Sequence, residues 1–297
     1  MARTFDIEPL AGTTFGAVVR GMKVAILDDA GWRDLYAAWL KYALLVFPGQ
    51  HLKRDEQIAF AKRFGALEFE MAALSNVKSD GTLRQEKDND DMMKILKGNM
   101  GWHADSTYMP VQAKGAVFSA EIVPGAGGQT GFADMRAAYD ALDAGRKAKV
   151  ERLAAHHSLH YSQSKLGHQT KKQDGEYSGY GLHDGPVPLR PLVKTHPETG
   201  RKSLLIGRHA HNIPGMDKAE SERLLQELVD FACQPPRVYH HDWTAGDAVV
   251  WDNRCLLHQA TPWDMTQPRV MWHSRIAGDP RSEAALGVTA VSAAASG

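Results

Sequence analysis

A histidine and an aspartate stand two residues apart in the segment WHADSTY, at His103 and Asp105. An imidazole and a carboxylate at this spacing can share one metal ion. However, the chain has 14 histidines and 35 acidic residues, so roughly one or two such pairs are expected by chance. The same spacing recurs at two other places, His196/Glu198 and His240/Asp242.

The surroundings of the three pairs favour the first of them. The pair at 196 lies in THPETG, which is typical of a solvent-exposed turn. The pair at 240 precedes a turn and a strand, where polar side chains at a strand end need no ligand. His103 and Asp105 follow the apolar Met100 and Trp102. A buried carboxylate needs a charged partner, and a metal ion is one.

A third ligand is available at His258, which follows a predicted strand. One carboxylate and two imidazoles form the facial triad of Fe(II) oxygenases, which leaves positions open for substrate and dioxygen. Arg269, eleven residues further on, could hold the distal carboxylate of 2-oxoglutarate through a two-pronged ion pair. Taken alone, these two residues would be a core histidine and a surface arginine. Their combination with His103 and Asp105 indicates an iron site.

The elements around these residues predict a protein that is mainly β with flanking helices, as a β-sandwich or a double-stranded β-helix (jelly roll). Apolar residues recur with helical spacing at the front of the chain, and short strands dominate its second half. We expect helices over 32–40, 53–65, 135–155 and 217–234, and strands over 43–48, 115–134, 191–207, 246–253 and 268–278. Residues 156–190 are polar and predicted to be irregular.

Composition indicates an ordinary globular protein, with 43% hydrophobic and 24% charged residues. Lys and Arg balance Asp and Glu at 35 each, so neither nucleic acid nor an anionic membrane is an expected partner. Only two cysteines, Cys233 and Cys255, and no signal-like start point to the cytoplasm. We expect one domain over 1–280 and a flexible tail over 281–297; homo-oligomer formation is left open.

Several segments together resemble the Fe(II)/2-oxoglutarate dioxygenases of the TauD/TfdA family, which includes taurine dioxygenase and the aryloxyalkanoate dioxygenases. The resemblance covers residues 5 to about 278 and is strongest to the branch selective for S-phenoxypropionates. The segments that carry it are LVFPGQ (45–50), FAKRFGALE (60–68), WHADSTY (102–108), GGQTGFADM (127–135), LVKTHPETGRKSLLIGRHAHNIPGM (192–216), WDNRCLLH (251–258) and PRVMWHSR (268–275).

The resemblance implies a jelly-roll core and a set of roles. His103, Asp105 and His258 would be the iron ligands and the catalytic residues. Arg269 and Thr130 would bind 2-oxoglutarate, and Asn99 would lie near the substrate or the co-substrate. Fe(II), 2-oxoglutarate and dioxygen are the expected cofactors. Residues 251–253 are interpreted as a turn that positions the segment carrying His258.

The substrate anion requires a further cation, and here the sequence departs from the wider family. Relatives such as taurine dioxygenase place a second arginine four residues after the first, where this chain has His273. Arg275 would share a strand face with His273. Arg208, in LLIGRHAH, is our first choice, followed by Arg275 and His273. The neighbouring His209 is a further candidate for substrate binding, with His211 as an assistant.

The resemblance implies hydroxylation of the α-carbon of an aryloxyalkanoate, either a phenoxyacetate or an S-phenoxypropionate. The product would break down to a phenol and glyoxylate or pyruvate, while 2-oxoglutarate yields succinate and CO₂. Two alternatives remain from the sequence. The first is a dioxygenase for taurine or alkyl sulfonates, and the second is a jelly-roll binding protein without catalysis.

Overall fold

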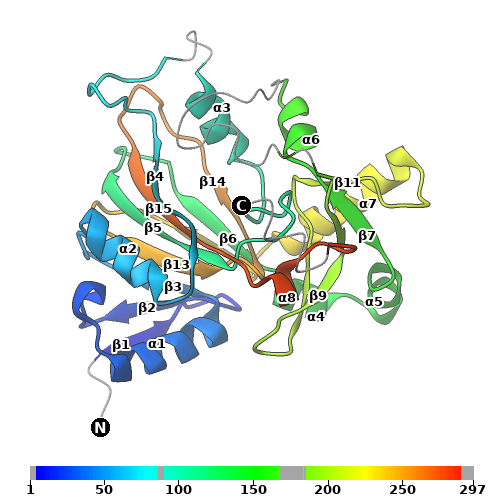
Figure 1. Ribbon diagram of the computed structural model, residues 1–297, viewed down its shortest axis with the longest axis horizontal. Helices are drawn as coiled ribbons and strands as arrows, with labels where there is room; N and C mark the ends of the chain where they lie inside the picture. The colour runs from blue at the N-terminus through cyan, green and yellow to red at the C-terminus, as the bar shows by residue number, and fades with distance from the viewer. Residues whose placement is uncertain (1–4, 86–89, 168–182, 184, 289–297) are drawn as a thin grey trace.

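Two β-sheets of very different width face each other in the computed structural model, which describes residues 5–85, 90–167, 183 and 185–288 (Figure 1). In spatial order the large sheet contains β1 (Asp6–Pro9), β2 (Ala17–Arg20), β3 (Leu44–Phe47), β13 (Ala248–Asp252), β5 (Gly115–Ile122), β15 (Val270–Ile276) and β4 (Leu67–Ser75). The small sheet contains β12 (Val238–His241), β6 (Thr130–Asp134) and β14 (Leu256–Ala260). Within these two sheets all pairs are antiparallel except β2 and β3.

Two short sheets and the helices complete the molecule. The short sheets are β11 (Ala210–His211), β7 (Ala154–His157) and β8 (Leu189–Pro191), and β10 (Lys202–Leu204) with β9 (Val193–Thr195). The helices are η1 (Val24–Ile26), α1 (Asp29–Tyr42), α2 (Arg54–Lys62), α3 (Asp91–Gly98), α4 (Met135–Ala141), α5 (Ala144–Val150), α6 (Leu159–Ser164), α7 (Lys218–Ala232) and α8 (Pro280–Glu283). None of the described helices is long and apolar enough to cross a membrane.

The large sheet is buried on both faces, which explains the continuous apolar run that predicted β3. Successive side chains of a strand point to opposite faces. Leu44 and Val46 therefore pack between the two sheets, with Phe118, Phe132, Trp251 and Met271. Leu45 and Phe47 pack on the other face, beneath Trp39 of α1 and Phe60 of α2. The expected jelly-roll architecture is confirmed.

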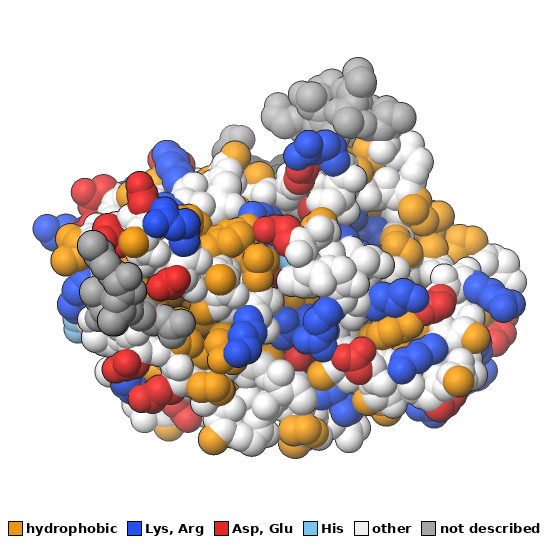
Figure 2. Space-filling view, turned by 90° about the horizontal axis from the view of Figure 1, so that it is seen from below, with side chains coloured by type: hydrophobic (Ala, Val, Ile, Leu, Met, Phe, Trp, Pro, Cys, Tyr) orange, Lys and Arg blue, Asp and Glu red, His pale blue; other side chains and the backbone are white. Residues whose placement is uncertain are grey.

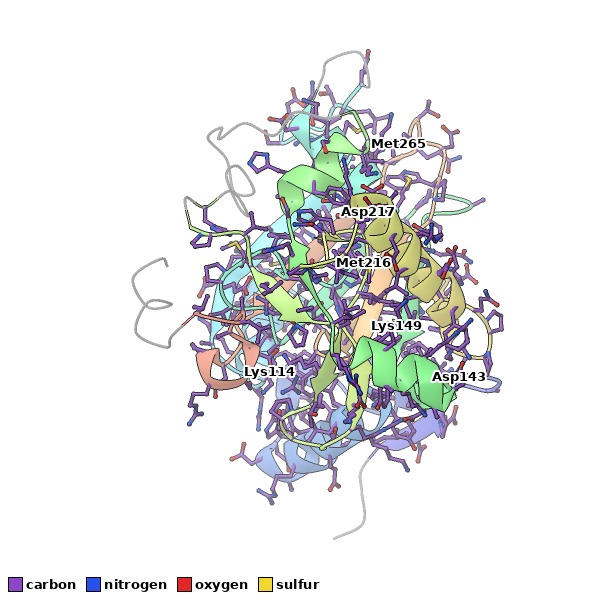
Figure 3. The ribbon with its side chains drawn as sticks, turned by 90° about the vertical axis from the view of Figure 1, so that its right-hand side faces the viewer. Lys114, Asp143, Lys149, Met216, Asp217 and Met265 are labelled. Carbon is purple, nitrogen blue, oxygen red and sulfur yellow. The ribbon has the colours of Figure 1, made fainter. Side chains whose placement is uncertain are left out.

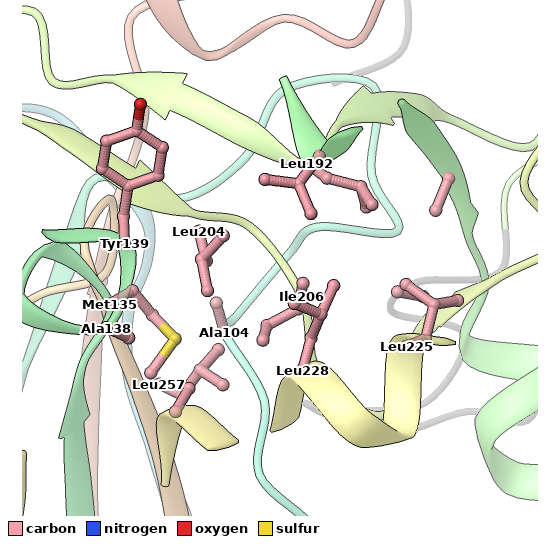
Figure 4. Close-up of a cluster of buried hydrophobic side chains, with 14 of the residues drawn as sticks. Ala104, Met135, Ala138, Tyr139, Leu192, Leu204, Ile206, Leu225, Leu228 and Leu257 are labelled. Atoms are coloured by element: carbon pink, nitrogen blue, oxygen red, sulfur yellow. The ribbon is translucent and has the colours of Figure 1, made fainter. Parts of the chain in front are cut away.

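Helices α4 and α7 cover the opposite side of the molecule. Figure 4 shows the hydrophobic cluster between these helices and the neighbouring strands, in which Met135 and Ala138 of α4 and Leu225 and Leu228 of α7 pack together with Ala104. Asp217 begins α7, as predicted, by accepting hydrogen bonds from two backbone N–H groups at 2.8 and 3.3 Å (Figure 3). On the face shown in Figure 2, Lys and Arg lie among Asp and Glu side chains.

Two boundaries differ from the prediction. The helix expected over 135–155 is two helices, because Leu142 has an extended backbone and Asp143 begins a new helix by capping it. The flexible tail expected from residue 281 does not begin there, since Glu283 is 1% exposed and forms an ion pair with Lys194, and Ala285 is also buried. Residues 289–297 of that expected tail lie outside the described part of the chain.

Candidate active site

Two extended segments hold the residues predicted as metal ligands. Backbone hydrogen bonds of 3.0 and 2.8 Å join His103 to His258 of β14 in both directions. Strand alternation then points neighbouring side chains to opposite sides. Ala104 and Leu257 pack into the cluster beside α7 (Figure 4). His103, Asp105 and His258 turn the other way, where they line a common cavity. One ligand atom from each of these three lies within 4.8 Å of the other two.

The two histidines present unprotonated nitrogens. Nδ1 of His103 lies 2.7 Å from the carbonyl oxygen of Gly101, which fixes a proton on Nδ1 and leaves Nε2 as the lone-pair atom. Burial, followed by the charge of His258, holds the pKa of His103 well below its ordinary value. Burial, followed by the charge of Arg275, lowers the pKa of His258 to about 3. Both rings are therefore neutral at physiological pH, as metal ligands must be.

Asp105 is held as a carboxylate with one oxygen to spare. Its backbone is clamped by the Asn253 side chain, which accepts from the N–H at 2.7 Å and donates to the carbonyl at 2.9 Å. Burial would raise the pKa of Asp105, but the Arg275 guanidinium and His273 outweigh it, and the pKa is lowered. Oδ1 accepts from Arg275 at 2.8 Å, whereas the buried Oδ2 has no hydrogen-bond partner.

This arrangement fits a divalent metal ion. Two neutral imidazoles and a carboxylate bring lone pairs together out of solvent, without an N–H or O–H donor for Oδ2 of Asp105. Buried acceptors without donors are costly, and a cation removes that cost. The donor set is the two-histidine, one-carboxylate set of oxygen-activating Fe(II) sites.

The described residues include a second compact group of possible ligands, His196, Asp252 and Cys255. In this group, His196 and Asp252 have no lone pair left for a metal ion, because their nitrogen and oxygen atoms are already engaged in hydrogen bonds. Nε2 of His196 donates to Asp252 at 3.0 Å, and Nδ1 accepts two backbone N–H groups of the following turn. Arg254 fills the remaining carboxylate positions. This group is therefore structural. The solvent-exposed turn predicted around His196 is present, but the histidine itself is not exposed to solvent: it is 2% exposed and anchors the turn from inside.

The residues chosen from the sequence line one cavity of about 110 Å³, hereafter the inner cavity: Asn99, His103, Asp105, Thr130, Arg208, His209, His258, Arg269, His273 and Arg275. His240, from the third pair, lies exposed at the end of β12, as predicted. The sequence missed Tyr108, Gln163 and Trp251, which also line the cavity. Tyr108 stands only three residues after Asp105, whereas Gln163 belongs to α6, in the segment predicted to be irregular.

Arg269 is a buried cation that forms no ion pair with a carboxylate in the described part of the chain. It is 3% exposed, its Nε donates to the carbonyl of Gly128 at 3.2 Å, and its guanidinium lies 5.1 Å from the Trp263 ring centre. A Cβ at Gly128, where φ is +67°, would stand 3.2 Å from that Nε, so glycine lets the arginine approach. Burial lowers the pKa of Arg269 only to about 10, and the charge persists.

Thr130 and Asn99 complete the walls of the inner cavity. Oγ1 of Thr130 accepts from the Trp243 indole N–H at 2.9 Å, so its own proton remains available to donate to an anion. Asn99 ends α3, and its backbone oxygen accepts from Ala260 at 2.7 Å. These backbone contacts hold the Asn99 side chain at the cavity wall.

Arg208 is the second cation without a carboxylate. Burial lowers its pKa to about 10, so it stays charged. Nη2 makes a long 3.4 Å contact to Ser162, and the buried Nη1 has no hydrogen-bond partner. Among the described residues no acid forms an ion pair with it. The guanidinium rests against Gly98, where a Cβ would stand 2.8 Å from Nη1.

The other three candidates for substrate binding have partners of their own. Arg275 points into the cavity, as strand alternation predicted, but its charge faces Asp105. His273 lies 3.7 Å from the same carboxylate, and burial, followed by the charge of Arg275, lowers its pKa to about 3. Nδ1 of His209 lies 2.8 Å from the Ser162 hydroxyl. His211 stacks on a tyrosine outside the inner cavity.

The fold and this site define a class of enzyme. The sequence matches the taurine catabolism dioxygenase TauD, TfdA family over residues 6–275, and the chain belongs to that family. The expectation of a dioxygenase of this family is confirmed.

Relatives within the family narrow the comparison. The chain is 82% identical over 286 residues to the (S)-phenoxypropionate/alpha-ketoglutarate-dioxygenase of Sphingobium herbicidovorans, covering 96% of this chain and 99% of that protein. It is 64% identical over 291 residues to the protein of the same name from Delftia acidovorans, with the same coverage. The crystal structure of AAD-2 with Mn(II) and N-oxalylglycine superposes with a TM-score of 0.86 at 38% identity, covering 96% of this chain and all of that one.

Proposed function

We propose that this chain is an Fe(II)- and 2-oxoglutarate-dependent dioxygenase that hydroxylates the α-carbon of aryloxyalkanoates, with a preference for S-phenoxypropionates. The observation that carries the proposal is Arg208, a largely buried cation with no carboxylate partner among the described residues, which lines the same cavity as His103, Asp105 and His258. It adds an anion site to the one that Arg269 offers. The names of the relatives at 82% and 64% identity support the substrate class and the S preference.

Six residues of the inner cavity then have distinct tasks. His103, Asp105 and His258 would hold Fe(II), and Arg275 keeps the Asp105 carboxylate ionised and oriented. Arg269 would bind the distal carboxylate of 2-oxoglutarate, because its guanidinium group is held in place by the Gly128 carbonyl and the Trp263 ring. Bound Fe(II) with 2-oxoglutarate uses dioxygen to insert one oxygen atom into a C–H bond, releasing succinate and CO₂.

Arg208 would orient the substrate through its carboxylate. The α-carbon is bonded directly to that carboxylate, so fixing the anion places its C–H bond toward the metal-binding group. Hydroxylation there gives a hemiketal from a phenoxypropionate or a hemiacetal from a phenoxyacetate. The bond between the α-carbon and the ether oxygen then breaks. The hydroxyl oxygen becomes the carbonyl oxygen of pyruvate or glyoxylate, and its proton passes to the released phenol oxygen.

The experiment is succinate release by the iron-loaded protein with both enantiomers of dichlorprop, phenoxyacetate and taurine. We expect S-dichlorprop to be turned over fastest, with one pyruvate and one phenol per succinate. A faster reaction with taurine would favour the sulfonate alternative. The absence of succinate with every substrate would favour a binding protein without catalysis.

A further inference from the structure

A second cavity, of about 700 Å³ and hereafter the outer cavity, lies next to the inner one. Arg208 and Gln259 line both cavities and therefore stand between them. The Arg208 side chain passes Gly98 at the end of α3 and reaches Ser162 in α6. The 3.4 Å contact to Ser162 is too long to be a strong hydrogen bond. The side chain that separates the two cavities is therefore held only weakly, because no described acid forms an ion pair with it.

The lining of the outer cavity suits an aromatic anion. Its aromatic and apolar walls include Trp102, Tyr161, Leu225 and Val229. Its charged lining consists of three cations, Lys97, Lys165 and Arg208, and one acid, Glu222. An apolar cavity with a few convergent charges is typical of small-molecule sites, and the excess of cations selects for negative charge.

The size of the inner cavity gives an independent reason to look outward. Small-molecule sites usually occupy about 300–1,000 Å³. The inner cavity has about 110 Å³ of free space for a metal ion, 2-oxoglutarate and the reacting carbon of the substrate. The outer cavity, at about 700 Å³, falls within the usual range. The outer cavity, on the far side of Arg208, therefore offers the larger space for an aryl ring.

We propose that the outer cavity is a binding site for the aromatic carboxylate on its way to the metal, and that Arg208 is the cation shared by the outer and inner positions. This inference rests on the proposed function for the identity of the substrate. The carboxylate first meets Arg208 from the outer side while the ring packs beside Trp102 and Tyr161. The guanidinium then keeps the anion as it turns into the inner cavity.

Two variants on the far wall of the outer cavity test this proposal in the iron-loaded enzyme. Val229→Trp fills the cavity from α7, away from the metal ligands. Lys165→Ala removes a rim cation that is 54% exposed and pairs with Glu222 at 3.2 Å. Its matched control is Lys62→Ala, which removes a lysine that is also 54% exposed and pairs with an acid, Glu70, at 2.6 Å. Both lysine variants change the net charge equally.

We expect Val229→Trp to lower kcat/KM for S-dichlorprop roughly tenfold, because the access route is blocked, and Lys165→Ala roughly threefold, because a rim charge acts on the association rate. Lys62→Ala should have no effect, and Glu222→Gln should raise kcat/KM. The affinity for 2-oxoglutarate should not change in any variant.

Two results would overturn the proposal. One is kcat/KM within twofold of the parent protein for both Val229→Trp and Lys165→Ala. The other is a loss of kcat at constant kcat/KM, which would make the outer cavity a route for product release. Failure of the proposed function is seen separately, because the parent protein would then release no phenol from S-dichlorprop.

Discussion

Replacing Arg208 by alanine should weaken substrate binding without affecting the co-substrate. In the structure Nη1 has no hydrogen-bond partner and Nη2 has only a 3.4 Å contact, so both are free for a carboxylate. A hydrogen bond to a charged group contributes about 1.5–3 kcal/mol, which corresponds to a factor of roughly 10–150 in binding. We expect the KM for S-dichlorprop to rise by at least about tenfold.

A measurement of the stability of Arg208→Ala shows whether the weaker substrate binding is specific or results from a damaged fold. Arg208→Ala removes a largely buried charge that no acid neutralises, so the free energy of unfolding should stay constant or increase. The assay is succinate release against S-dichlorprop and, separately, against 2-oxoglutarate, with urea unfolding of the same samples. Arg208→Lys keeps the charge, so its KM for S-dichlorprop should lie between those of the parent protein and of Arg208→Ala. If Arg275→Ala raises the substrate KM while Arg208→Ala leaves it within about threefold, the assignment of Arg208 is refuted.

Three further predictions concern the metal, the co-substrate and pH. His103→Ala should abolish iron binding and turnover but leave the circular dichroism spectrum intact, whereas His240→Ala should retain both; the reverse would show that the wrong pair was chosen. Arg269→Lys loses the Nε bond and the fork, so the KM for 2-oxoglutarate should rise roughly 10–150-fold and the substrate KM should barely change. His258 and His273 have folded pKa values of about 3, below the value of about 6.5 in an unfolded chain. The unfolded state of the metal-free protein therefore takes up protons first as the pH falls, and each histidine removes up to about 2 kcal/mol of stability between about pH 7.5 and 5. Equal urea midpoints at these two pH values would contradict this reasoning.

The convergence of His103 and Asp105 could be predicted because their geometry is local. In an extended segment, residues two apart lie on the same face, so His103 and Asp105 reach one point whatever the rest of the chain does. The same rule places His258 opposite the apolar Leu257, which needs a core beside it. β3 was equally readable, since a strand buried on both faces has to be apolar at every position.

The remaining features depend on partners that are distant in the sequence. His196 is buried beside Asp252, 56 residues further on, which accepts a hydrogen bond from its ring, and nothing in THPETG indicates this. Arg275 faces Asp105 across 170 residues, so its role beside a metal ligand could not be distinguished from substrate binding. Gln163 reaches the cavity on a single short helix, whose apolar pattern is too brief to stand out from a loop.

The buried and largely buried arginines differ in the groups that neutralise their charge, and this difference indicates where anions bind. Three of them face a buried carboxylate: Arg136 with Asp134, Arg254 with Asp252, and Arg275 with Asp105. Arg190 donates to three backbone carbonyls instead. Among the described residues, the buried Arg269 and the largely buried Arg208 have neither kind of neutralising arrangement. A charge held away from water in that condition costs several kcal/mol. Two bound anions would remove this cost, one from 2-oxoglutarate and one from the substrate. A neutral ester of the same aryloxyalkanoate would leave Arg208 unneutralised, so the site would reject it even though its ring and α-carbon are identical.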